Sequence, residues 1–307
     1  MEYCIEVKNL TKHYKQVEAV KNISFYVEKG QLYGFLGVNG AGKSTTINML
    51  CTLLKKNAGD VVVCGYTLGE QDEAIRKRIG VVFQENTLDE QLSIKENLMM
   101  RGSFYITDKE KLRKQYEHVC TILDIKELEH RRFGKLSGGQ KRICEIAKSI
   151  MNAPELLFLD EPTTGLDPKT RQDVWMCLEK LQTEMEMTIF LTTHYMEEAA
   201  KANYVSIMNK GEIVAKGTPT QLKQTYAHDM LKLTYHDEGQ VKQILDSYNC
   251  IYNVESNHIC VQLKQTIDSI AYLPQLAPYL DSYEVLQGTM DDVFLNITGL
   301  NIKEETR

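Results

Sequence analysis

The fold of this 307-residue chain is decided by one stretch, Gly37-Val38-Asn39-Gly40-Ala41-Gly42-Lys43-Ser44-Thr45. The stretch follows an apolar run at 32–36 and opens a helical pattern at 46–54, so the motif G-x-x-x-x-G-K-[ST] stands between a predicted strand and a predicted helix. Such a loop turns backbone N–H groups toward phosphate oxygens, and the helix after it adds the positive end of its dipole. The stretch predicts a phosphate-binding loop, in preference to the alternative that its glycines only mark a chain reversal.

The residues of this loop have separate expected roles. Lys43 is expected to reach the outer phosphates, and Ser44 is expected to bind Mg²⁺. Further nucleotide contacts are expected along the rest of the loop, at Gly37, Asn39, Gly40, Ala41, Gly42 and Thr45.

Length and composition describe a globular chain of two domains. Its 307 residues exceed the usual size of one domain. Hydrophobic residues make up 43% and charged residues 25% of the chain, which is average for globular proteins and argues against a disordered or fibrous chain. The net charge of −6 lacks the basic character of nucleic-acid binders, so we expect no nucleic-acid partner.

The chain has the features of a cytosolic protein. Its eight cysteines are scattered without a C-x-x-C pair, at Cys4, Cys51, Cys64, Cys120, Cys144, Cys177, Cys250 and Cys260. Reduced thiols are therefore expected, rather than disulfides or a zinc site. No apolar stretch approaches the length of a membrane span, and the N-terminus lacks a signal-peptide pattern. We expect no direct membrane insertion, so any membrane role requires a partner.

Two acidic residues follow a strand that is predicted to be buried. The run 156–159 is apolar throughout, as in a parallel sheet covered on both faces, and such sheets bind ligands where their strands end. Asp160 is expected to hold Mg²⁺, and Glu161 to polarise a water molecule for in-line attack. The predicted strand 188–192 brings His194 to the same edge, as a candidate sensor of the terminal phosphate. An exposed Asp-Glu turn is the alternative, which the phosphate loop disfavours.

A second anion-binding helix start is predicted at Leu136-Ser137-Gly138-Gly139-Gln140, ahead of a helical run at 141–151. One nucleotide needs only one such cradle from its own strand-loop-helix unit. The second cradle therefore suggests a nucleotide held by another copy of the chain. A helix cap without a ligand is the alternative.

Two further residues are candidates from their positions alone. Tyr14 ends a polar connection at 11–14 between two predicted half-buried strands, and its ring is suited to stacking on a purine base. A packing or surface tyrosine is the alternative. Gln84 follows the predicted strand 79–83, where an amide suits Mg²⁺ or the attacking water, although an ordinary loop residue is equally compatible with the pattern.

The chain is predicted to divide near a Gly217-Thr218-Pro219 break. An α/β domain at 1–217 contains a helical insertion at about 86–150, where helical patterns replace strands. The domain at 218–307 has the strand and helix order βαββαβ, which is that of the ferredoxin-like unit. Its amphipathic tail helix at 290–295 is expected to dock back or to bind a partner.

Together these features resemble the nucleotide-binding subunit of ABC transporters over about the first 220 residues. The resemblance is carried, in the family's order, by the phosphate loop, the signature at 136–140, the acidic strand end at 156–161, the turn at 165–167 and His194. It implies a P-loop NTPase of the α/β class with a mixed sheet, a helical subdomain and a small α+β C-terminal domain.

The resemblance also implies roles for single residues. Tyr14 is similar in place to the adenine-stacking aromatic, Gln84 to the glutamine of the loop that faces the helical subdomain, and His194 to the switch histidine. Asp167 joins the nucleotide-binding set. Val38 departs from the proline of many members, which leaves the backbone cradle intact.

The function implied by the resemblance is hydrolysis of ATP, with Mg²⁺, to power a separate integral-membrane permease. In the family, two subunits pack head to tail and the signature of each caps the ATP of the other, so a homodimer is expected in the ATP-bound state, peripheral on the cytoplasmic face of the membrane. The stretches 192–199 and 289–299 look most like the drug and antibiotic exporter branch, which implies export of a drug, an antibiotic or a lipid-like substrate. The alternative is a soluble ABC-type ATPase of translation or DNA repair; such relatives usually carry two nucleotide units or a long coiled-coil insertion, and neither is visible.

Overall fold

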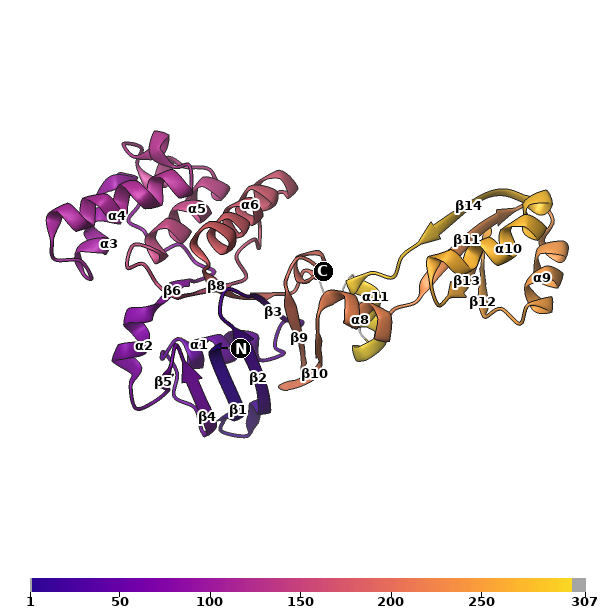
Figure 1. The fold of residues 1–307 in the computed structure, drawn as a ribbon, viewed down its shortest axis with the longest axis horizontal. Coiled ribbons are helices and arrows are strands. Elements are labelled where there is room, and N and C mark those ends of the chain that lie inside the picture. The colour runs from indigo at the N-terminus through magenta and orange to yellow at the C-terminus, as the bar shows by residue number, and fades with distance from the viewer. Residues whose placement is uncertain (1, 300–307) are drawn as a thin grey trace. The chain divides into compact units, whose positions relative to one another are not determined.

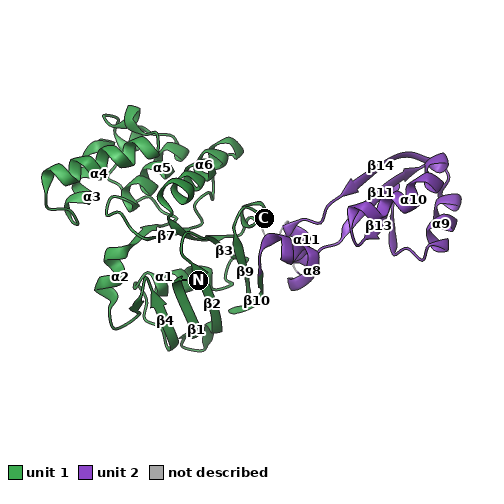
Figure 2. Ribbon diagram, in the orientation of Figure 1, with its two compact units in different colours: residues 1–216 green, residues 217–307 purple. Residues whose placement is uncertain are grey.

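The computed structural model describes residues 2–299. The chain forms two compact units, Met1–Lys216 and Gly217–Arg307 (Figure 2). The predicted C-terminal domain includes residues 300–307, which lie outside the described part of the chain.

The first unit is built on a six-stranded sheet in the order β10-β9-β3-β8-β7-β6 (Figure 1). Its strands are β3 (Leu32–Leu36), β6 (Ile79–Val82), β7 (Leu156–Asp160), β8 (Thr188–Thr193), β9 (Tyr204–Asn209) and β10 (Glu212–Gly217). The pairs from β9 to β6 are parallel. Every residue of β3 and β8 is buried, which explains why the sequences of both strands are mostly apolar without alternation. The carboxyl ends of β3, β7 and β8 consequently meet at one edge of the sheet.

A second, antiparallel sheet has the order β2-β1-β4-β5. Its strands are β1 (Tyr3–Tyr14), β2 (Val17–Glu28), β4 (Ala58–Val63) and β5 (Tyr66–Thr67). The prediction of a polar connection at 11–14 is wrong, because β1 continues through these residues and Tyr14 pairs with Val17. This end of the hairpin is largely exposed to solvent, so the alternation of apolar and polar residues that marks a half-buried strand is missing there.

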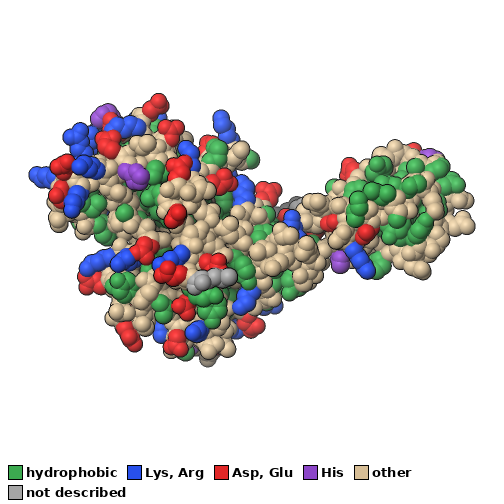
Figure 3. Space-filling model, in the orientation of Figure 1, with side chains coloured by type: hydrophobic (Ala, Val, Ile, Leu, Met, Phe, Trp, Pro, Cys, Tyr) green, Lys and Arg blue, Asp and Glu red, His purple; other side chains and the backbone are tan. Residues whose placement is uncertain are grey.

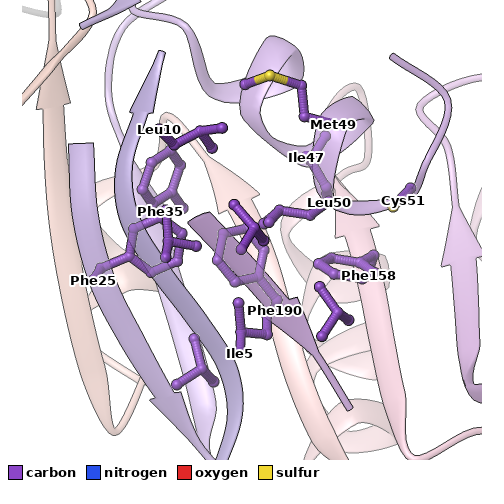
Figure 4. Packing of buried hydrophobic residues seen from close by; sticks show 14 of the residues in the cluster. Ile5, Leu10, Phe25, Phe35, Ile47, Met49, Leu50, Cys51, Phe158 and Phe190 are labelled. Carbon is purple, nitrogen blue, oxygen red and sulfur yellow. The ribbon is translucent and has the colours of Figure 1, made fainter. Parts of the chain in front are cut away.

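The main core lies between the two sheets, with helix α1 (Lys43–Leu50) packed into it (Figure 4). Phe190 of β8 lies among four other rings, with centroid distances of 5.4 Å to Phe35, 5.5 Å to both Tyr33 and Phe158, and 6.0 Å to Phe25. Helix α1 ends four residues before the predicted end at 54, and Thr52 beyond it has a positive φ of 65°.

The helical insertion follows β6. Helix α2 (Asp72–Arg78) precedes that strand, and α3 (Ile94–Ser103), α4 (Lys109–Ile122) and α5 (Gly138–Ser149) follow it. Ser93 and Glu96 form a capping box on α3, and Asp108 caps α4. Two single-turn 3₁₀ helices, Lys126–Leu128 and Phe133–Lys135, lie before α5. Helix α5 begins at Gly138, three residues before the predicted start at 141, because the signature itself forms its first turn.

Two more helices complete the unit: α6 (Pro168–Met185), capped by Asp167, and the short α7 (Met196–Ala199) after β8. Figure 3 shows acidic and basic side chains mixed over the visible face of the first unit. Within residues 2–299, no helix has both the length and the apolar composition that crossing a bilayer requires.

The second unit has its own sheet, in the order β12-β13-β11-β14, with antiparallel pairs throughout. Its elements are β11 (Asp229–Tyr235), α9 (Glu238–Ser247), β12 (Tyr252–Glu255), β13 (His258–Leu263), α10 (Ser269–Leu276) and β14 (Leu280–Leu286), with single 3₁₀ turns at Thr266–Asp268 and Ala277–Tyr279. A separate core includes Leu231, Val241 and Val261. The predicted ferredoxin-like order βαββαβ is confirmed.

A helix at the start of this unit was not predicted. The break at 217–219 does not only end the first unit, because Thr218 and Gln221 form a capping box that opens α8 (Pro219–Tyr226). The tail helix α11 (Met290–Thr298) packs on α8, and the side chain of Asn296 donates to the carbonyl of Tyr226 at 2.8 Å.

We expect Phe190→Ala to lower the free energy of unfolding of the first unit by about 3–5 kcal/mol, because a cavity would remain among four packed rings. Urea unfolding followed by the fluorescence of the single tryptophan, Trp175, measures this loss. Phe104→Ala is the control: its ring is 71% exposed, so a change within about 0.5 kcal/mol is expected. Equal losses in both variants would contradict the assigned core.

Candidate active site

The phosphate loop is held tightly between β3 and α1. Gly42 has a φ of 109°, and a Cβ atom on it would lie 2.4 Å from the carbonyl oxygen of Ala19. A Cβ atom on Gly37 would lie 2.5 Å from the carbonyl oxygen of Met208. Neither position accepts a side chain without movement of the backbone, so both glycines are required for the loop to keep this path.

Lys43 is turned into the loop that it belongs to. Its side chain is 4% exposed, and Nζ donates to the carbonyl oxygens of Gly37 at 2.8 Å and Val38 at 3.2 Å. Nζ also lies 3.3 Å from Oε1 of Glu161. Burial lowers the pKa of Lys43, and the attraction of Glu161 opposes that shift.

Glu161 lies between two basic groups. Besides Lys43, Nδ1 of His194 lies 3.2 Å from Oε2, and the hydroxyl of Thr164 donates to Oε2 at 3.1 Å. The contact with His194 holds the pKa of Glu161 at about 2, assisted by Lys43 and against the opposing effect of burial. Glu161 is therefore fully ionised at neutral pH.

Asp160 precedes Glu161 at the end of β7 and faces the start of α1. The hydroxyl of Ser44 donates to its Oδ1 at 3.4 Å, and that of Thr192 donates to the same atom at 2.5 Å. The site therefore gathers five of the predicted residues: Lys43, Ser44, Asp160, Glu161 and His194.

Arg142 of α5 contacts the backbone of these acids and was not predicted. Its guanidinium donates to the carbonyl oxygens of Phe83, Pro162, Asp160 and Glu161, at 2.5, 2.6, 3.2 and 3.2 Å. Burial lowers the pKa of Arg142 to about 10, which leaves it charged at neutral pH. One side chain thus joins the helix that begins at the signature to the edge of the sheet where β7 ends.

Three other predicted residues lie on exposed segments outside this cluster. Tyr14 is 46% exposed at the tip of the β1–β2 hairpin, whose second strand approaches the phosphate loop at Ala19. Gln84 is exposed two residues past β6, the neighbour of β7 in the sheet. Asp167 is exposed and caps α6, accepting from the backbone of Thr170 at 3.1 Å.

The signature lies at the exposed start of α5. Ser137 caps this helix in a box with Gln140, and Gly138 beside it is exposed. Gly139 is buried, and a Cβ atom there would lie 2.2 Å from the side chain of Thr170 on α6. In residues 2–299, no hydrogen bond or ion pair joins Ser137, Gly138 or Gly139 to the phosphate loop of the same chain.

The site has the chemistry that Mg²⁺ and a triphosphate require. Ser44 and Asp160 supply the hard oxygen ligands that Mg²⁺ prefers. Lys43 and the free N–H groups at the start of α1 suit phosphate oxygens. Nδ1 of His194 is buried and faces Oε2 of Glu161 at 3.2 Å.

Comparison with known proteins agrees with this geometry. A profile of the ABC transporter family matches residues 20–164. The chain is 33% identical over 305 residues to the daunorubicin/doxorubicin resistance ATP-binding protein DrrA of Streptomyces peucetius, covering 96% of this chain and 92% of that one. It is 33% identical over 315 residues to the linearmycin resistance ATP-binding protein LnrL of Bacillus subtilis, covering 98% and 100% of the two chains.

Solved structures are similar over the first unit. One is cbiO1 of Clostridium perfringens, part of the ABC transporter complex cbiONQ, with a TM-score of 0.68 and 27% identity over 72% of this chain and 91% of that one. Another is the ATP-binding cassette MJ0796, in a dimeric post-hydrolysis state with ADP and Pi, with a TM-score of 0.63 and 28% identity over 70% and 98% of the two chains.

The chain belongs to the ABC transporter family, as an ATP-binding subunit that hydrolyses ATP. Within that family it is an ATP-powered subunit of the drug and antibiotic exporter branch. The relatives do not support the alternative of a translation or DNA-repair ATPase.

We expect the acid-induced loss of stability to depend on Glu161. Its pKa in the folded chain, about 2, lies below the usual 4.5, so its contribution is present above pH 4.5 and is lost as the pH falls toward 2. The difference in unfolding free energy between the wild type and Glu161→Gln, measured by urea unfolding at a series of pH values, should shrink over that window. Glu73→Gln, which removes an exposed ion pair with Lys77, should show little such dependence. A difference that stays constant as the pH falls would contradict the assigned contacts of Glu161.

Proposed function

We propose that two copies of this chain pack head to tail around ATP, with the signature of each enclosing the nucleotide held by the other. The observation that carries the proposal is the position of Ser137 and Gly138, which are exposed at a helix start and make no bond to their own phosphate loop within residues 2–299. A helix N-terminus attracts phosphate. The dimeric state of the similar cassette MJ0796 supports the same arrangement.

Within each half of this dimer, we assign the chemistry to groups at the sheet edge. Tyr14 stacks on the adenine, the loop 37–45 holds the phosphates, and Asp167 approaches from the second copy. Ser44, Asp160 and Gln84 would hold Mg²⁺, which would neutralise charge on the phosphates. The γ-phosphate draws Lys43 away from Glu161, which frees that carboxylate to polarise the attacking water. His194 then contacts the γ-phosphate.

We expect Glu161→Gln to lower ATP turnover by at least about 100-fold while ATP still binds, because the water loses its base. The variant should sediment as a dimer with ATP and as a monomer without it. Adding Ser137→Arg should abolish the dimer but leave ATP binding, since Ser137 contacts the ATP of the other copy.

Ser93→Arg in the same background is the matched control. Ser93 caps α3 with the same kind of box as Ser137 on α5, so the local cost is similar, but the dimer should persist. Undiminished turnover in Glu161→Gln would remove Glu161 from its role. A dimer that survives Ser137→Arg would contradict the head-to-tail arrangement.

We propose further that a separate membrane permease docks on a groove in the first unit. The groove encloses about 630 Å³ and is lined by apolar side chains that solvent reaches, Leu53, Met100, Phe104 and Tyr105, at 59%, 49%, 71% and 42% exposure. Arg76 and Arg101 add positive charge, whereas Lys148 is paired with the buried Glu145 at 2.5 Å, and Asp89 also lines the groove. An amphipathic helix with acidic groups at its ends matches this lining.

The groove also connects to the ATPase site. Phe83 lines it, and the carbonyl of Phe83 shares Arg142 with those of Asp160 and Glu161. A partner that shifts Phe83 therefore acts on the acids through one buried side chain. The names of the relatives, which include resistance to daunorubicin and to linearmycin, support export of a drug, an antibiotic or a lipid-like compound by the complex.

We expect Phe104→Asp to abolish co-purification with an integral-membrane chain, because a charge would replace the most exposed ring of the groove. Tyr26→Asp, on a 39% exposed ring of β2 outside the groove, is the control and should leave the complex intact. Membrane extraction followed by affinity purification measures both. Persistence of the complex in Phe104→Asp, or sedimentation of the wild type with ribosomes instead, would contradict the proposal.

A further inference from the structure

Strand β8 ends in two buried threonines whose hydroxyls have different partners. Successive side chains of a strand point to opposite faces. Thr193 donates to the buried carboxylate of Glu198 at 2.6 Å. Thr192, on the other face, contacts Asp160 and Glu161. The sequence pattern did not single out Thr192, because a threonine in a buried strand is common.

The hydroxyl of Thr192 binds both acids at once. It donates to Oδ1 of Asp160 at 2.5 Å and accepts from the backbone N–H of Glu161 at 3.1 Å. The carbonyl oxygen of Thr192 accepts from the same N–H at 3.2 Å. A hydroxyl can donate one hydrogen bond, and that of Thr192 donates it to the carboxylate of Asp160. Thr192 is completely buried, so no water competes for these bonds.

The backbone of Glu161 needs this support. Its φ of 46° is in the left-handed region, which residues other than glycine adopt only where surrounding contacts fix them. The N–H bonds to Thr192 are contacts of this kind. If the backbone of Glu161 relaxed, its carboxylate would turn away from Lys43 and His194, which lie 3.3 and 3.2 Å from it.

We infer that Thr192 is a positioning residue for ATP hydrolysis. It acts through the carboxylate of Asp160 and the backbone of Glu161. The inference rests on the proposed roles of these two acids.

Thr192→Val tests the inference, because valine has nearly the same shape and lacks the hydroxyl. The turnover number should fall about 10- to 100-fold, which is the loss expected when a catalytic group is displaced by up to about 1 Å. The KM for ATP should stay within about threefold, since the phosphate loop is unchanged. Thr192→Ser keeps the hydroxyl and should retain turnover within about threefold of the wild type.

Thr188→Val is the matched control. Thr188 lies on the same strand, is 2% exposed and accepts from the backbone of Gly30 at 3.0 Å, away from the acids. Its loss should lower stability without changing the turnover number. Hydrogen exchange of the peptide that carries Glu161, measured without nucleotide, should be faster in Thr192→Val and unchanged in Thr188→Val.

The outcomes separate this inference from the proposed function. Normal turnover in Glu161→Gln would refute the proposed function. Low turnover in Glu161→Gln beside normal turnover in Thr192→Val, equal losses in Thr192→Val and Thr188→Val, or failure of Thr192→Ser to retain turnover would each overturn the role of Thr192 alone.

Discussion

The carboxylate of Glu161 is a mostly buried negative charge, and burying such a charge is costly unless opposite charges and hydrogen bonds compensate it. Lys43 and His194 provide the compensation, from positions far apart in the sequence. They meet because β3, β7 and β8 are neighbouring parallel strands whose carboxyl ends share one edge. In the proposed mechanism, ATP alters this balance of charge, since its phosphates and Glu161 both attract Lys43.

Arg142 explains how movement of a neighbouring segment affects the position of Asp160 and Glu161. Arg142 carries a buried positive charge that four backbone carbonyls satisfy, and those carbonyls belong to the segments before Gln84 and around the two acids. The planar guanidinium holds these segments in one geometry. Movement of α5, of the loop after β6 or of the acids therefore disturbs the other two.

Much of the fold was predictable where a local pattern had one physical meaning. The phosphate loop, the buried run before Asp160 and the βαββαβ order of the second unit all follow from the spacing of glycines and apolar residues. The pattern failed at 11–14, where an exposed hairpin end lacks alternation, and at 217–219, where residues that end one unit also cap α8. Both failures concern contacts that the spacing of apolar residues and glycines does not predict: the pairing of β1 with β2 and the capping box of α8.

The sequence by itself determined which residue types stand at the ends of β3, β7 and β8, because motif spacing and buried runs are local properties. The tertiary structure alone decided which side chains hold them there. Thr192 and Asp160 are 32 residues apart, and Arg142 and Phe83 are 59 apart, so no periodicity connects either pair. Such hydrogen bonds form only after the parallel strands and α5 have packed. For that reason no local sequence pattern predicts them.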